Sequence, residues 1–261
     1  MPEANNLPQY PEMKGKVALV TGGSSGIGLA TALAFARQGA TVVIASRNEK
    51  RAQGALKAMA ETNAVSWVRC DVSNGTDVEE LCAAIKKRHE RLDYAFNNGG
   101  SGGRLAPVAS TTEEAWRKTI DGFLTSVFLC MRHEIPLMLT GESGVIVNNS
   151  SVDGLRGYPF PGGAAYSAAK HGVLGLTKSA ALEHAAKGPR ITAICPGWVA
   201  TPPVASFMRR DSSTAAEIVR QTPRRRIASP DEIAEGVLWL CSRAASFMIG
   251  SPLVIDGGYM A

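Results

Sequence analysis

Short apolar runs alternate along this chain with longer stretches in which apolar residues recur with a helical period. A strand buried on both faces reads as a continuous apolar or β-branched run, so the short runs predict strands and the longer stretches predict helices. The seven predicted strands are residues 17–20, 41–45, 66–69, 94–96, 145–148, 191–194 and 253–255. Because strands that alternate with helices pair in parallel, the pattern predicts an α/β protein with one doubly wound, seven-stranded parallel sheet and helices on both faces.

Hydroxyl side chains three residues before a glutamate mark the start of three predicted helices. This spacing lets the hydroxyl accept a backbone N–H while the glutamate reaches back to the capping residue. The pairs are Thr76 with Glu79, Thr111 with Glu114, and Ser229 with Glu232. We therefore expect each of these hydroxyl residues to cap a helix.

Two segments fall outside the alternation of strands and helices. Residues 1–13 contain prolines and lack an apolar signal core, so they are predicted to form a flexible tail before a domain that spans residues 14–261. Residues 196–229 are rich in Pro, Ser and Arg and form the longest predicted irregular segment. A loop of that length in a compact domain is usually functional, so residues 197–228 are expected to form a substrate lid.

Composition adds a few constraints to this picture. With 261 residues, of which 45% are hydrophobic, the chain can bury one sizeable core, which favours a single domain. Lys and Arg exceed Asp and Glu by 28 to 23, a modest excess that suits an anionic ligand and, without a recognition motif, does not indicate nucleic acid. The five cysteines and four histidines are scattered, so neither a disulfide framework nor a metal site is expected. No segment approaches the roughly 18 apolar residues of a membrane span, and we expect a cytoplasmic protein.

A glycine-rich turn joins the first predicted strand to the helix after it. The turn reads TGGSSGIG from Thr21 to Gly28. Glycines let the backbone approach a pyrophosphate closely, and the helix N-terminus offers free N–H groups to its charge. A turn that serves only helix–sheet packing would also be rich in glycine, so this motif alone leaves both interpretations open.

The ends of the next strands indicate which nucleotide is bound. NAD-binding proteins carry an acidic residue after the second strand, whereas this chain has Ser46 and Arg47 there. A guanidinium suits a 2′-phosphate, so NADP(H) is the preferred cofactor and NAD(H) remains an alternative, unless Arg47 is simply solvated. Residues 71–72 and 97–100 follow the third and fourth strands, at the sheet edge that binds ligands. Asn97 could instead cap a turn.

The chemistry of the chain is predicted to lie around Tyr166 and Lys170. These residues are four positions apart, so they share one face of a helix, and Ser151 follows the fifth predicted strand. A lysine ammonium and a cationic nicotinamide would favour the phenolate and bring the pKa of the tyrosine toward neutrality. Ser151 would hydrogen-bond the substrate oxygen while Tyr166 exchanges a proton with it. Taken alone, the tyrosine–lysine pair could equally be an exposed helix pair.

In their order along the chain, these motifs resemble the short-chain dehydrogenase/reductase family over residues 14–258. The resemblance implies a Rossmann fold, NAD(P)(H), reversible hydride transfer between a carbonyl and an alcohol, and a homotetramer or homodimer. It also implies that Ser151 orients the substrate, that Tyr166 is the acid–base, and that Lys170 binds the nicotinamide ribose and tunes Tyr166. The residues implied to bind the cofactor are Gly22, Ser24, Ser25, Ile27, Arg47, Asp71, Val72, Asn98, Gly99, Tyr166, Lys170, Pro196, Gly197, Val199 and Thr201.

The chain departs from the family pattern at three places. Phe123 stands where the family usually has an asparagine that helps to hold a water on a proton relay to the lysine. Gly122 before it is expected to kink the helix and aim the Phe123 carbonyl at that water. The segment between Ser151 and Tyr166 is about two residues longer than usual and is expected to shape the substrate pocket. Gly100 replaces a common alanine and is expected to make a flexible floor beside the nicotinamide.

Phe123 also keeps two alternative functions open. One is a non-redox isomerase, cyclase or lyase on the same fold, and the other is a catalytically silent nucleotide-binding protein. The arginine runs at residues 209–210 and 224–226 flank the expected lid and would either meet an acidic partner or be solvated. His171 points about 100° away from Lys170 around the helix and is not expected to be a second base. The loops near residues 104, 158 and 207 are expected to select the substrate.

Overall fold

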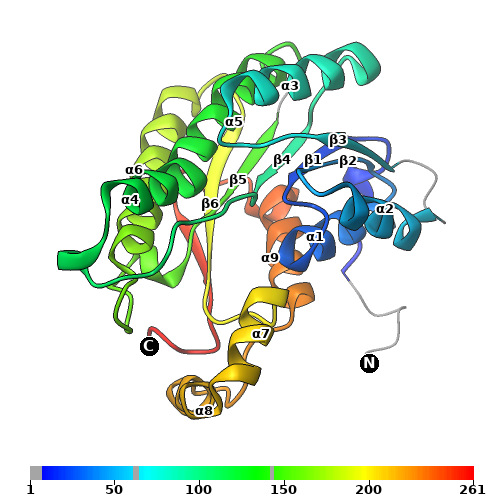
Figure 1. Ribbon diagram of the computed structural model, residues 1–261. Helices are drawn as coiled ribbons and strands as arrows, with labels where there is room; N and C mark the ends of the chain where they lie inside the picture. Colours follow the sequence, from blue (N-terminus) through cyan, green and yellow to red (C-terminus); the bar gives the residue numbers. More distant parts are fainter. Residues whose placement is uncertain (1–7, 61–64, 142–143) are drawn as a thin grey trace.

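Seven strands form a single parallel sheet within the residues that the computed structural model describes, 8–60, 65–141 and 144–261 (Figure 1). They are β1 (Val17–Thr21), β2 (Thr41–Ser46), β3 (Val65–Arg69), β4 (Tyr94–Asn97), β5 (Val145–Asn149), β6 (Arg190–Pro196) and β7 (Pro252–Ile255). Their order in the sheet is β3-β2-β1-β4-β5-β6-β7. All seven predicted strands are confirmed. The winding reverses between β1 and β4, and such a point opens a crevice beyond the carboxyl ends of the strands.

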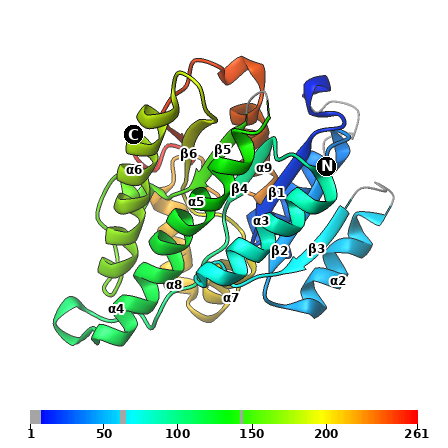
Figure 2. The ribbon, with the colours of Figure 1, turned by 90° about the horizontal axis from the view of Figure 1, so that it is seen from above.

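Helices cover both faces of the sheet, as predicted (Figure 2). The helices are α1 (Gly26–Arg37), α2 (Glu49–Ala58), α3 (Gly75–His89), α4 (Glu113–Ile120), α5 (Ser126–Met138), α6 (Ala164–His184), α7 (Pro202–Arg210), α8 (Ser212–Gln221) and α9 (Pro230–Cys241). One apolar cluster joins α1, α2 and α9 to one face of the sheet, and a second joins α3, α5 and α6 to the other. The inner strands β1, β2, β4, β5 and β6 are therefore buried on both sides, which explains their apolar runs, while the edge strands β3 and β7 are partly exposed.

One of the three predicted caps is confirmed and two are wrong by one or two residues. Ser229 caps α9 in a full capping box with Glu232. Helix α3 is capped by Asn74, whose side-chain oxygen accepts the amides of Thr76 and Asp77, and not by Thr76 itself. Helix α4 is capped by Thr112 rather than Thr111. In each of these helices another residue that can cap stands one or two positions from the predicted one, and its side chain accepts the first helix amides.

The structured domain begins earlier than the predicted boundary at residue 14. Residues 1–7 of the expected tail lie outside the described residues. Pro11–Met13 form a short 3-10 turn, Met13 is fully buried, and Tyr10 packs against the core. The backbone N–H of Tyr10 also donates to the side-chain oxygen of Gln38 at 2.9 Å. Apolar contacts thus hold residues 10–13 on the domain, which corrects the expectation of flexibility there.

The expected irregular lid is also corrected, because most of residues 202–221 is helical. Pro202 stands in the first turn of α7, where a proline is tolerated, and Asp211 caps α8 by accepting the amide of Thr214 at 2.9 Å. Pro202 and Asp211 therefore mark helix starts within the segment whose Pro, Ser and Arg content suggested a loop. Both helices follow β6 and lie together at one end of the molecule (Figure 1).

Candidate active site

The glycine-rich turn places the start of α1 beside the carboxyl end of β1. Gly22 and Gly26 have positive φ angles of 67° and 54°, and a Cβ on Gly28 would lie 2.4 Å from the carbonyl oxygen of Gly22. Packing inside the turn therefore accounts for the glycines in part. The side chain of Ser25, at the N-cap of α1, makes no capping hydrogen bond. The first amides of α1 are thus available to an anion.

A cavity of about 150 Å³ opens next to this turn. Its lining includes seven of the residues predicted to bind the cofactor: Gly22, Ser24, Ser25, Arg47, Asp71, Val72 and Gly99. The exposed guanidinium of Arg47 donates to Asp71 and to Ser101, each at 3.3 Å. Burial opposes ionisation of Asp71, but hydrogen bonds from Ser73 and the charge of Arg47 outweigh it and lower the pKa of this carboxyl. Ser46 is buried and accepts a hydrogen bond from the Trp67 indole, so Arg47 is the better anion donor.

Three asparagines at the ends of β4 and β5 have structural partners. The side chain of Asn98 donates to the carbonyl of Thr21 at 3.1 Å and accepts from Asn149 at 3.0 Å, which ties three strand ends together. Asn98 lines neither this cavity nor the larger cavity over Tyr166. Asn97 is buried and donates to Glu134 at 2.9 Å in the helical layer. Neither expectation for Asn97, a ligand contact or a turn cap, describes this position.

Ser151, Tyr166 and Lys170 come together at the end of β5. Ser151 lines the same cavity as Tyr166 and is placed to interact with its phenol, whereas Ser150 donates to the carbonyl of Lys170 at 2.9 Å. Lys170 is only 5% exposed, and its Nζ donates to the carbonyl of Asn149 at 2.6 Å. The alternative of an exposed helix pair is therefore wrong. His171, by contrast, is exposed and bonds to the carbonyl of Ser167, as its place on the helix predicted.

Burial sets the protonation of this trio before any ligand enters. It raises the pKa of the Tyr166 phenol well above its ordinary value, although the hydrogen bond from Ser151 opposes it, and the carboxylate of Asp153 raises it further. Burial also lowers the pKa of the Lys170 ammonium to about 8. Before any ligand enters, Tyr166 is therefore a neutral phenol, whereas Lys170 is still mostly an ammonium at neutral pH. A bound cation would lower the pKa of the Tyr166 phenol toward neutrality, because it favours the phenolate.

Phe123 packs directly on the catalytic pair. Its ring centroid lies 5.1 Å from the Nζ of Lys170 and 5.1 Å from the ring centroid of Tyr166, with the two rings edge to face. A cation over an aromatic face is stabilised by the ring quadrupole. The phenylalanine thus holds Lys170 in place with the face of its ring.

Gly100 and Gly122 pack against Phe123 and its helix turn. A Cβ on Gly100 would lie 2.7 Å from the ring of Phe123, so Gly100 makes room for that ring rather than a flexible floor. A Cβ on Gly122 would lie 1.7 Å from the carbonyl oxygen of Ser101. The expected distortion at Gly122 is confirmed as a π-helical turn over Asp121–Thr125. The carbonyl of Gly122 accepts the hydroxyl of Ser126 at 2.9 Å.

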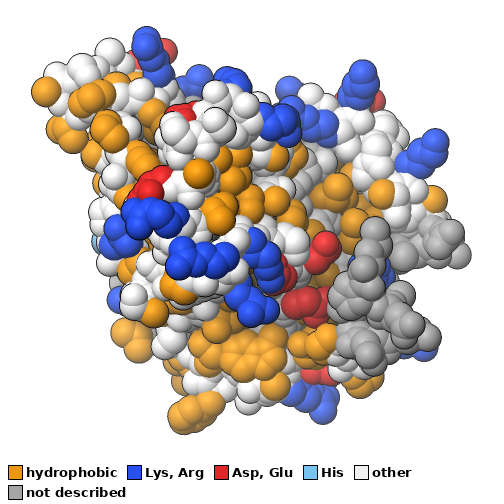
Figure 3. Space-filling model, turned by 90° about the horizontal axis from the view of Figure 1, so that it is seen from below, with side chains coloured by type: hydrophobic (Ala, Val, Ile, Leu, Met, Phe, Trp, Pro, Cys, Tyr) orange, Lys and Arg blue, Asp and Glu red, His pale blue; other side chains and the backbone are white. Residues whose placement is uncertain are grey.

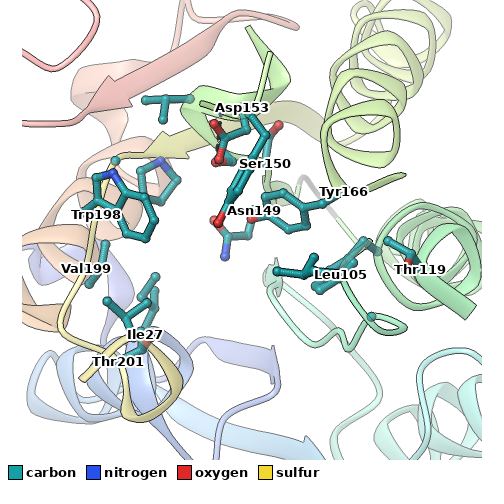
Figure 4. Close-up of a pocket in the computed structure, with 18 of the residues that line it drawn as sticks. Ile27, Leu105, Thr119, Asn149, Ser150, Asp153, Tyr166, Trp198, Val199 and Thr201 are labelled. Atoms are coloured by element: carbon teal, nitrogen blue, oxygen red, sulfur yellow. Dashed lines mark hydrogen bonds between the residues drawn. The ribbon is translucent and has the colours of Figure 1, made fainter. Parts of the chain in front are cut away.

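A second cavity, of about 370 Å³, lies over Tyr166 (Figure 4). Trp198, Val199, Ile27 and Thr201 line one side of it, Tyr166 and Leu105 face them, and Asp153 and Ser150 lie at one end (Figure 4). Pro196 and Gly197 also line it. The longer segment after Ser151 shapes this cavity through Tyr158, as predicted, while Phe160 packs between Tyr158 and Trp198 with ring centroids 6.1 Å from each. The walls are mostly apolar and the polar groups converge on the phenol.

Sequence reasoning missed several lining residues and named two that do not contribute. Arg104 and Phe207 do not line the cavity, whereas their neighbours Leu105 and Val204 do. Asp153 and Trp198 were not singled out. Both follow the ends of predicted strands, which is a signal that could have marked them.

Several arginines of the two runs bond to groups within the protein. Arg226 pairs with Glu232 through two contacts of 2.7 Å, and Arg225 donates to the carbonyl of Arg220 at 2.8 Å. Lys and Arg side chains gather on the face that carries α7 and α8 (Figure 3).

Within the described ranges, no group of three or more His, Cys, Asp or Glu is placed to hold a metal, and no helix is both long and apolar enough to cross a bilayer. The five cysteines are free and buried.

Comparisons with known proteins agree with this geometry. The profile of a family described as enoyl-(acyl carrier protein) reductase matches residues 22–260. The chain is 41% identical to a cyclohexanol dehydrogenase of Acinetobacter sp. (strain SE19), over 94% of each protein. It is 40% identical to an A-factor type gamma-butyrolactone 1'-reductase of Streptomyces virginiae, over 94% of this chain and 95% of the relative. Among solved structures, an actinorhodin polyketide ketoreductase with NADPH superposes with a TM-score of 0.88 at 33% identity, covering 97% of this chain and 99% of that one.

Proposed function

The chain belongs to the short-chain dehydrogenase/reductase family and is an oxidoreductase that acts on CH–OH groups, and we propose that it interconverts a cyclic secondary alcohol and its ketone, with NADP(H) preferred over NAD(H). The observation that carries this proposal is the convergence of Ser151, Tyr166 and buried Lys170 at the base of a mostly apolar cavity.

The residues beside the glycine-rich turn fit a nicotinamide dinucleotide. The turn offers uncapped helix amides, and a cavity lined by Arg47 and Asp71 begins next to it. Anionic phosphates bind well at such a helix start. Arg47, Asp71 and Val72 would hold the adenosine end, and Ile27, Pro196, Gly197, Val199 and Thr201 would border the nicotinamide end, because they line the second cavity. When bound, NAD(P)(H) supplies or accepts the hydride.

The protein's own residues handle the substrate oxygen and its proton. Ser151 donates a hydrogen bond to that oxygen, and Tyr166 gives it a proton in reduction or removes one in oxidation. Lys170 stabilises the phenolate form of Tyr166 by its charge, since its Nζ lies 5.6 Å from the centroid of the Tyr166 ring. The apolar walls exclude water, which strengthens each of these interactions.

The preference for NADP(H) is supported by Arg47. Its guanidinium is exposed at the second strand end, where an acidic residue would repel a 2′-phosphate. Its hydrogen bonds to Asp71 and Ser101 are long, at 3.3 Å, so a phosphate could replace them. The NADPH in the related ketoreductase structure agrees with this proposal.

The substrate class follows from the cavity walls. Trp198, Val199, Leu105 and Phe123 offer apolar faces to a volume of about 370 Å³, which suits a compact ring system. Both named relatives act, by their names, on ring compounds. The non-redox and silent alternatives rested on Phe123. Because Phe123 packs on the catalytic pair and leaves it assembled, no observation favours them.

Assembly and location remain proposals. We propose a cytoplasmic homotetramer or homodimer whose only ligands are the cofactor and a small molecule, without nucleic acid or membrane. Exposed Trp116, Phe128 and Leu182 on α4, α5 and α6 support an apolar contact between copies. Light scattering after size-exclusion chromatography measures the mass directly, and a monomer would contradict the proposal.

The decisive test combines a cofactor comparison with one substitution. The purified protein is mixed with NADPH or NADH and a panel of cyclic and open-chain ketones, and nicotinamide absorbance is followed. We expect faster oxidation of NADPH, selectivity for cyclic ketones, and a loss of at least about 100-fold in Tyr166→Phe, because the phenylalanine carries no proton. Tyr10→Phe makes the same change far from the site and should keep full activity. Turnover that survives in Tyr166→Phe would refute the proposed role.

A further inference from the structure

A carboxyl-bearing residue lies inside the catalytic cluster of Ser151, Tyr166 and Lys170. Asp153 lines the substrate cavity, is 8% exposed, and stands two positions after Ser151 in the turn that follows β5. The Ser151 hydroxyl donates to a carboxyl oxygen of Asp153 at 3.2 Å, and the backbone N–H of Asp153 donates to the same hydroxyl at 3.1 Å. Ser151 and Tyr166 line the same cavity, and the Ser151 hydroxyl is placed to interact with the phenol, whose pKa it lowers. One hydroxyl therefore joins the carboxyl to the phenol.

The surroundings of Asp153 keep this carboxyl able to exchange a proton. Among the described residues, no ion pair within 4.0 Å involves it. The charged and titratable groups that face it are Arg156, Lys170, His171, Tyr158 and Tyr166. Burial raises the pKa of Asp153, although the Ser151 hydrogen bond and the three cations oppose the rise. A carboxyl held in this way is protonated at higher pH than an exposed aspartate.

The other side of Tyr166 is closed by aromatic rings. Phe123 meets Tyr166 edge to face at 5.1 Å, and the Tyr158 ring meets it at 6.2 Å. Lys170 lies over the rings of Phe123 and Tyr166 and donates to the carbonyl of Asn149. A phenyl side chain neither donates nor accepts a proton. The Ser151 hydroxyl is thus the side-chain group beside the phenol that hydrogen-bonds onward, to the carboxyl of Asp153.

We propose that Asp153 is a positioning residue that supplies protons to Tyr166 through Ser151. This inference rests on the proposed function, in which the nicotinamide cofactor supplies the hydride. As the substrate oxygen takes the proton of Tyr166, the phenolate oxygen takes the proton of Ser151, and Ser151 takes the proton of Asp153. Asp153 then regains a proton from water in the cavity. Oxidation of an alcohol runs the same transfers backwards, and each group ends with the protons it began with.

The kinetic test uses two substitutions and a matched control. Asp153→Asn keeps the size of the side chain and an acceptor for Ser151 but cannot release a proton. We expect kcat for ketone reduction at neutral pH to fall on the order of 100-fold, as for loss of a general acid, while KM for the ketone changes less than about twofold. The fall of kcat with rising pH, caused by ionisation of Asp153, should disappear. Formate should restore activity to Asp153→Ala, and Asp231→Asn, on the exposed start of α9, should match the unmodified protein.

Each kinetic outcome decides the proposal when the protein reduces ketones. Loss of the pH dependence together with formate rescue supports the relay. An Asp153→Asn variant with unchanged kcat overturns it. A slower variant that keeps the pH dependence and is not rescued by formate overturns it as well, because Asp153 would then have only a structural role.

A titration that needs no turnover separates this inference from the proposed function. The side-chain carboxyls of a 13C-aspartate-labelled protein are titrated by NMR, and the signal of Asp153 is identified by its loss in Asp153→Asn. We expect the midpoint to rise in Ser151→Ala, which removes the hydrogen bond, and to shift also in Tyr166→Phe. If no ketone is reduced, the proposed function fails while these shifts still support the coupling. A midpoint that ignores Tyr166→Phe shows that no chain connects the two groups and overturns the inference.

Discussion

The buried carboxyl of Glu134 leads to a prediction about stability. Glu134 is fully buried on α5, and one carboxyl oxygen accepts the side-chain amide of Asn97 at 2.9 Å. The other carboxyl oxygen and the amide oxygen of Asn97 have no hydrogen-bond partner. The buried thiols of Cys82 and Cys130 lie close by and bring no positive charge. Burial therefore raises the pKa of Glu134 from 4.5 to about 7, although the bond from Asn97 opposes it.

The raised pKa fixes the sign of the effect. Between pH 4.5 and 7 the folded protein keeps the proton of Glu134 while the unfolded chain loses it, so the free energy of unfolding falls as pH rises. At about 1.4 kcal/mol per pH unit, the loss amounts to about 3 kcal/mol and is complete slightly above pH 7. The stability supplied by the neutral carboxyl is fully present below pH 4.5.

Glu134→Gln removes this ionisation and nearly keeps the shape of the side chain. We expect urea unfolding at pH 8 to show a variant more stable than the unmodified protein by roughly 2–3 kcal/mol, and the two to agree within about 1 kcal/mol at pH 5. Glu79→Gln makes the same change on the exposed face of α3 and should leave the difference between the two pH values unaltered. If Glu134→Gln loses stability between pH 5 and pH 8 as steeply as the unmodified protein, the reasoning is refuted.

Three further predictions concern the packing around Phe123 and the cofactor end. Gly122→Ala forces a Cβ to within 1.7 Å of the Ser101 carbonyl, so a thermal melt should show a fall of roughly 10 °C, and an unchanged melting temperature would contradict the fit. Gly100→Ala places a Cβ 2.7 Å from the Phe123 ring and should lower stability, with the loss reduced when Phe123→Leu is added. Additive losses would argue against that coupling. Arg47→Leu should raise KM for NADPH at least about tenfold and leave KM for NADH nearly unchanged, and equal effects on both would remove Arg47 from phosphate recognition.

The five inner strands were predictable because they are buried on both faces, which leaves a nearly continuous apolar run in the sequence, whereas the edge strands β3 and β7 are only partly buried. Their parallel pairing, with helices on both faces of the sheet, followed from the alternation of strands and helices. Local end signals were less specific. Thr111 and Thr112 both have the extended backbone of a cap, but the Thr111 hydroxyl donates to the carbonyls of Ala106 and Pro107, and the Thr112 hydroxyl accepts the amide of Ala115. In residues 197–228, proline and aspartate mark helix starts, and the same residue types are equally typical of loops.

The catalytic pair was predictable for a different reason, since a spacing of four places two side chains on one helix face. Partners that meet only in three dimensions left no such pattern. Asn97 ends a strand at the ligand edge, yet its side chain turns to Glu134, 37 positions away in the sequence. Asp153 is two positions from Ser151, but its carboxyl acquires chemical meaning only because burial and the Ser151 hydroxyl hold it beside Tyr166.

Phe123 shows how a departure from a family pattern should be judged. Read alone, a phenyl group in place of an asparagine suggests that redox chemistry is impaired. In the structure its ring occupies the space that Gly100 leaves open, and its face holds the Lys170 ammonium at 5.1 Å. Two apparent losses, of a polar side chain and of a methyl group, are thus one compact arrangement that keeps the catalytic lysine in position. The phenyl group supplies no proton path, and the proposed path runs instead through Ser151 to the carboxyl of Asp153.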